Sequence, residues 1–136
     1  MKIQNNITFG AKVPTKTVLG LASERCLYDN AWHDNIQTIE KLAGENSMDG
    51  MASMGTVVTF EKVGRVIKKL IPDLDPFLKD IDRLRYIRIS KRDDKINKIV
   101  KAAEDKFGKE IEIPEEEIRR VVKATNAPLN AILMDI

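Results

Sequence analysis

Cys26 and His33 are the two side chains best suited to nucleophilic catalysis, and the chain contains one residue of each type. A cysteine nucleophile needs a histidine within hydrogen-bond distance and a third group that orients the imidazole. Asp29 and Asp34 lie close in sequence and have the right chemistry for that third role. The expected helices, however, place Cys26 and His33 on either side of a break, so nothing forces them together. We therefore lean against an enzyme and assign no catalytic residue.

Closely spaced aspartates suggest acid–base or metal chemistry at three places, which are Asp73/Asp75, Asp80/Asp82 and Asp93/Asp94. Acid–base catalysis needs two carboxyl groups that converge in a cleft with separated pKa values. Each pair has a local explanation instead: Asp75 precedes Pro76 as a helix cap would, and Asp94 is spaced to pair with Lys98. The sequence contains no calcium-loop, Walker or dinucleotide pattern. We expect no metal and no cofactor.

A basic cluster over residues 83–98 is the group of side chains that best indicates a ligand class. It consists of Arg83, Arg85, Tyr86, Arg88, Lys91, Arg92, Lys95 and Lys98. Such cations neutralise phosphates, and an interleaved tyrosine can stack on a base. Acidic residues are mixed into the same stretch and the net charge is only +2. RNA or DNA binding through this cluster is therefore the alternative, and a solvated, salt-bridged helix face is the main expectation.

Apolar residues in the first half of the chain provide a candidate surface for a partner protein. They are Phe9, Trp32, Ile36, Ile39, Met48, Met51 and Met54. Trp32, Ile36 and Ile39 fall at helical spacing, and methionine adapts readily to different contact surfaces. The same stripe would equally suit an intramolecular core. The leading functional expectation is a non-catalytic cytoplasmic protein-binding or adaptor domain of unknown partner.

The elements that would position these residues are best defined near residues 90–113. Ile96, Val100 and Phe107 repeat at helical spacing before Gly108 stops the helix, and residues 109–113 alternate as a strand does. An alternating stretch at 86–90 predicts a second strand, parallel to the first across the intervening helix. Further helices are expected at 17–27, 32–43, 59–70, 77–84, 115–125 and from 128, while 56–60 fits either strand or helix.

These elements predict an α+β, mainly α fold, a small helical domain of about six helices with two or three short strands. We divide the chain into an N-terminal arm with two amphipathic helices (1–47), a Met/Gly/Ser linker or loop (48–55) and a compact mainly helical body (56–136). The N-terminal residues lack the apolar stretch of a secretory signal, and no run approaches the ~18 apolar residues of a membrane span. We expect a cytoplasmic protein with no membrane partner.

One family resemblance covers residues 59–136. Phe77-Leu-Lys-Asp80, Ala103-Glu-Asp-Lys-Phe107-Gly108 and Ile113-Pro114-Glu115 resemble motifs of acyl carrier proteins. The resemblance implies a four-helix bundle with separate helices at 115–125 and 128–136. The family's modified serine in Asp-Ser-Leu is absent, because the stretch after Ile81 begins Asp82-Arg83. A non-modifiable acyl-carrier-like helical domain is thus the second alternative.

Overall fold

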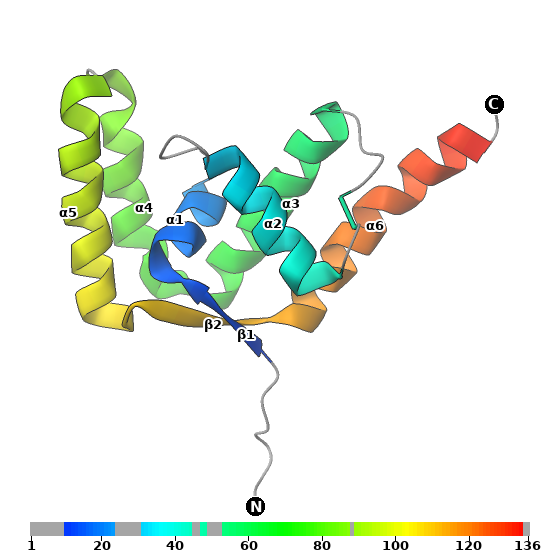
Figure 1. The fold of residues 1–136 in the computed structure, drawn as a ribbon, viewed down its shortest axis with the longest axis horizontal. Coiled ribbons are helices and arrows are strands. Elements are labelled where there is room, and N and C mark those ends of the chain that lie inside the picture. The colour runs from blue at the N-terminus through cyan, green and yellow to red at the C-terminus, as the bar shows by residue number, and fades with distance from the viewer. Residues whose placement is uncertain (1–9, 24–30, 45–46, 49–52, 88, 135–136) are drawn as a thin grey trace, which may run out of the picture.

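The computed structural model describes residues 10–23, 31–44, 47–48, 53–87 and 89–134, and these form a mainly helical α+β fold (Figure 1). Within these ranges six α-helices and two short 3₁₀ helices accompany a two-stranded sheet. The elements are β1 Gly10–Pro14, α1 Thr15–Ser23, α2 Ala31–Ala43, α3 Ser53–Leu70, η2 Pro72–Leu74, α4 Asp75–Asp82, η3 Arg83–Tyr86, α5 Ile89–Phe107, β2 Glu110–Pro114 and α6 Glu115–Met134. The predicted fold class is confirmed, with two strands in this part of the chain.

Helix α1 lies at the centre of the fold because its sequence is apolar on nearly every side. Val18, Leu19, Leu21 and Ala22 are almost completely buried. A short helix without a polar face is stable only when other elements surround it. Helices α2, α3, α4 and α5 all pack against α1 (Figure 1).

The sheet joins the two halves of the chain, and the predicted parallel pairing is wrong. Strand β1 pairs antiparallel with β2, so that Val13 lies opposite Ile111 and Ala11 opposite Ile113. Val13, Ile111 and Ile113 face the core and are at most 9% exposed. The two-stranded sheet therefore brings together residues that are nearly a hundred positions apart in the sequence.

The predicted strand at 86–90 is also wrong. Residues Arg83–Tyr86 form η3, and α5 begins at Ile89. The backbone N–H of Ile87 donates to the carbonyl of Leu84 at 3.0 Å, which keeps this stretch in a turn. Alternation over so few residues does not distinguish a strand from the junction of two helices.

Two helix boundaries differ from the prediction. Helix α3 begins at Ser53, so residues 56–60 are helical and the last three positions of the predicted linker belong to a helix. Helix α6 continues through Pro128, where a new helix was predicted. Proline removes its own N–H donor and crowds the carbonyl four residues earlier, which weakens a helix without always ending it.

Two glycines end helices as the sequence indicates. Gly44 follows α2 with φ +119°, and Gly108 follows α5 with φ +93°. Both values lie where residues with a Cβ are strained.

The first helices share one core with the later ones. Ile39 and Leu42 of α2 belong to the same buried cluster as Val63 and Ile67 of α3 and Ile118 of α6. Helix α2 packs against α1 and α6, and α3 packs against α1 and α6. The domain boundaries proposed from the sequence stay a prediction.

Candidate functional site

The predicted apolar partner surface contributes to the core at the positions that the structure describes. Ile39 is 0% exposed and Met48 is 7% exposed, while Ile36 is partly buried against the same cluster. Trp32 and Met54 lie within α2 and α3, but their side chains are outside the description, as are Phe9 and Met51 altogether. Ile39 and Met48 therefore have almost no surface to present to another protein.

The structure adds no support for a catalytic or metal centre. His33 is exposed on α2, and Cys26 lies outside the described residues. Among residues with a described placement, no group of three or more His, Cys, Asp or Glu is arranged to hold a metal ion. Over the same residues, none of the helices combines the length and apolar character that crossing a bilayer requires.

The basic cluster is divided between η3 and α5. Arg83 is exposed on η3, and Lys91, Lys95 and Lys98 are exposed on α5, whereas Arg92 is partly buried. Arg85 and Tyr86 have undescribed side chains, and Arg88 lies outside the described residues.

Ion pairing in this region differs from the prediction. Asp94 and Lys98 form no ion pair, and neither Lys91 nor Lys95 pairs with any described residue. The ion pair expected from the spacing of Asp94 and Lys98 is therefore not formed. On α6, Arg119 Nη2 lies 3.3 Å from Glu115 Oε2, and Arg120 Nη1 lies 3.1 Å from Glu117 Oε2.

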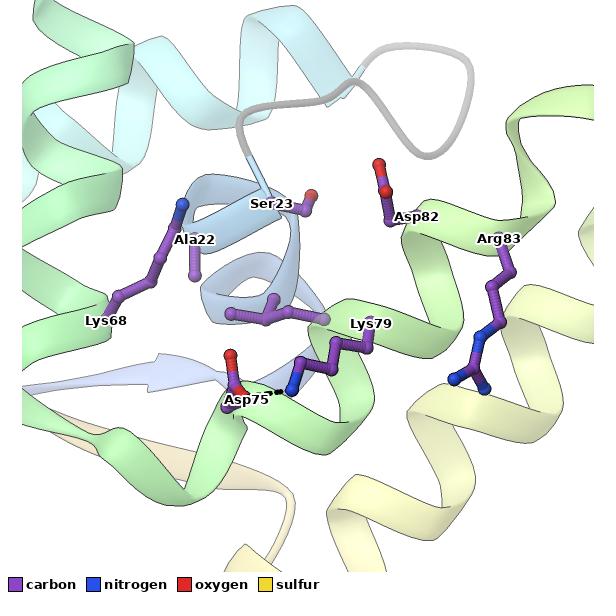
Figure 2. A pocket seen from close by; sticks show the side chains of 8 residues that line it. Ala22, Ser23, Lys68, Asp75, Lys79, Asp82 and Arg83 are labelled. Atoms are coloured by element: carbon purple, nitrogen blue, oxygen red, sulfur yellow. Dashed lines mark ion pairs between the residues drawn. The ribbon is translucent and has the colours of Figure 1, made fainter.

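A hollow of about 320 Å³, which we call the α4 groove, lies where α1 and α3 end beside α4 (Figure 2). Helix α1 contributes Ala22 and Ser23, and the last turns of α3 contribute Lys68. The remaining lining residues come from α4 and the start of η3, and are Asp75, Leu78, Lys79, Asp82 and Arg83. The sequence-based prediction included only Arg83 from this set.

The geometry of α4 explains why one of its faces is charged. Pro72 starts the 3₁₀ turn that leads into α4, and Leu74, Leu78 and Ile81 anchor the helix in the core. Asp75, Lys79 and Asp82 fall at i, i+4 and i+7 and are exposed. Asp75 was predicted to cap this helix, but it is the first helical residue and no side chain caps the helix.

The charges along the α4 groove are paired, and the pairs are exposed to solvent. Lys79 Nζ lies 3.1 Å from Asp75 Oδ2, and these side chains are 67% and 61% exposed (Figure 2). Arg83 Nη1 lies 3.0 Å from Asp80 Oδ1, outside the lining. Exposed pairs of this kind contribute about 0–1 kcal/mol each. A ligand that offered a competing charge could therefore replace one partner at small cost.

A second hollow of about 280 Å³ extends the groove toward the start of α4. It shares Lys68, Asp75 and Leu78 with the first and adds Ile71 and Pro72. The second hollow thus combines the apolar side chains of Ile71 and Pro72 with the charged side chains of Lys68 and Asp75. The lining of the first hollow holds three cationic and two acidic side chains.

The described lining of the α4 groove contains no nucleophile paired with a general base. Ser23 is its one hydroxyl-bearing lining residue, and that Oγ donates to the Gly20 carbonyl at 3.1 Å. A serine nucleophile needs an adjacent general base such as histidine, and the described lining includes neither His nor Cys.

No family model, curated protein or solved structure matches this chain. The resemblance to acyl carrier proteins therefore depends on short motifs alone. One of its implications is wrong, because residues 115–134 form the single helix α6 instead of two helices.

Proposed function

We propose that this chain is a non-catalytic cytoplasmic binding domain that docks a partner protein in the α4 groove. The observation that supports this proposal is an open hollow, formed where α1 and α3 end beside α4, whose charged lining is exposed. Small-molecule sites are usually more enclosed and mostly apolar, with few polar groups. Long, exposed Lys and Arg side chains instead suit the polar rim of a protein interface.

The rigidity of the surrounding fold also favours recognition at this place. Leu74, just before α4, and Ile81 within it are buried in the core, with exposed fractions of 0% and 1%. Most of the neighbouring helix α1 is also buried. Groove residues on such anchored helices keep their relative positions before a partner arrives. Preorganisation of this kind lowers the entropic cost of association.

Site-specific photo-crosslinking tests the proposal. A benzophenone amino acid is introduced at Lys79 or Asp82, which line the groove, and at Lys101 or Lys123, which are exposed on α5 and α6. Each purified full-length variant is irradiated in an extract of the source cells, and the adducts are identified by mass spectrometry. We expect the same protein to be captured from both groove positions and not from the controls.

The groove-specific capture should also depend on charge. Lys68→Glu in the benzophenone-labelled chain should reduce the adduct strongly, whereas Lys62→Glu on the same helix should not, because Lys62 does not line the groove. Adducts of equal yield from groove and control positions, or none from the groove, would overturn the proposal.

A second candidate function, polyanion binding along α5, follows from one specific observation. Lys91, Lys95 and Lys98 are exposed and form no ion pair with the described residues. Unpaired lysines on one helix face can neutralise successive phosphates. Asp93 and Asp94 on the same helix reduce the local field, which is why this function ranks second.

Fluorescence anisotropy with a labelled single-stranded oligonucleotide at about 50 and about 200 mM salt tests this candidate. Electrostatic binding should be strongest at low salt, fall steeply at high salt, and weaken on Lys95→Glu with Lys98→Glu. An unchanged anisotropy at the lower salt concentration would eliminate nucleic-acid binding through α5.

A further inference from the structure

We draw no further inference here: the strongest candidate, the exposed face of α3 that carries Lys62, Arg65 and Lys69, is a charged surface patch, and nothing in the structure shows what covers it.

Discussion

Thr15 connects the start of α1 to the turn between α5 and β2 through two hydrogen bonds. Its N–H donates to the Lys109 carbonyl at 2.9 Å, and its Oγ1 donates to the Gly108 carbonyl at 2.6 Å. The residue is 0% exposed. One residue therefore connects two segments more than ninety positions apart in sequence, through its backbone and its side chain.

Thr15→Val keeps the shape of this side chain but removes its hydroxyl. We expect the free energy of unfolding to fall by about 1–2 kcal/mol, because the Gly108 carbonyl loses its donor. Urea denaturation followed by circular dichroism measures the change. Thr17→Val is the matched control, since no side-chain hydrogen bond of Thr17 is found with the described residues, and it should change stability by less than about 0.5 kcal/mol. Equal effects would contradict the role given to Thr15.

Gly10 marks a close approach between the two strands. A Cβ at this position would stand 2.6 Å from Glu112 Cγ and 2.8 Å from the carbonyl oxygen of Ile113. We expect Gly10→Ala to lower the free energy of unfolding by about 1–3 kcal/mol, because β1 and β2 must move apart locally to make room for the added Cβ. Thermal denaturation measures this, with the exposed neighbour change Lys12→Ala as control. A Gly10→Ala protein as stable as the parent would show that β1 and β2 are less closely packed.

At the scale of elements, Ile39 connects α2 to the core. Ile39 is 0% exposed and Ile36 is only partly buried. We expect Ile39→Ala to lower the free energy of unfolding by about 2–5 kcal/mol and Ile36→Ala by a clearly smaller amount. Chemical denaturation of both variants provides the comparison. A stable Ile39→Ala protein that lost only partner capture would restore the interface predicted from the sequence.

Elements with local signals could be predicted from the sequence, and those defined by distant contacts could not. Gly108 and the apolar repeat before it predicted the end of α5, because a helix stop depends on adjacent residues. The strand predicted to pair with β2 was wrong, because β2 pairs with β1, whose residues lie nearly a hundred positions away in the sequence. The segment Gly10–Pro14 alone is too short to reveal that pairing.

The candidate site illustrates the same limit. The i, i+4, i+7 spacing of Asp75, Lys79 and Asp82 was the one local sign of a charged face on α4. Ser23 and Lys68 join them only because α1 and α3 end beside α4. No spacing along the sequence carries that information, since the groove is formed by tertiary packing.

At the scale of the whole molecule, the shared core predicts one cooperative unfolding transition. The first helices and the later ones contribute to a single buried cluster. Trp32, the one tryptophan of the chain, reports on α2, and far-ultraviolet circular dichroism reports on all helices. We expect both signals to change at the same urea concentration. Two separate transitions would instead support an independent N-terminal unit at residues 1–47.

We propose that a partner protein binds the α4 groove on an already folded body. Hydrogen exchange of the full chain, free and bound to the partner identified by crosslinking, tests it most directly. Binding in the groove should add protection in α4 and in the last turns of α1 and α3, and leave the exchange of α5 and α6 unchanged. Added protection confined to α5, or unchanged exchange along α4 at saturating partner, would contradict it.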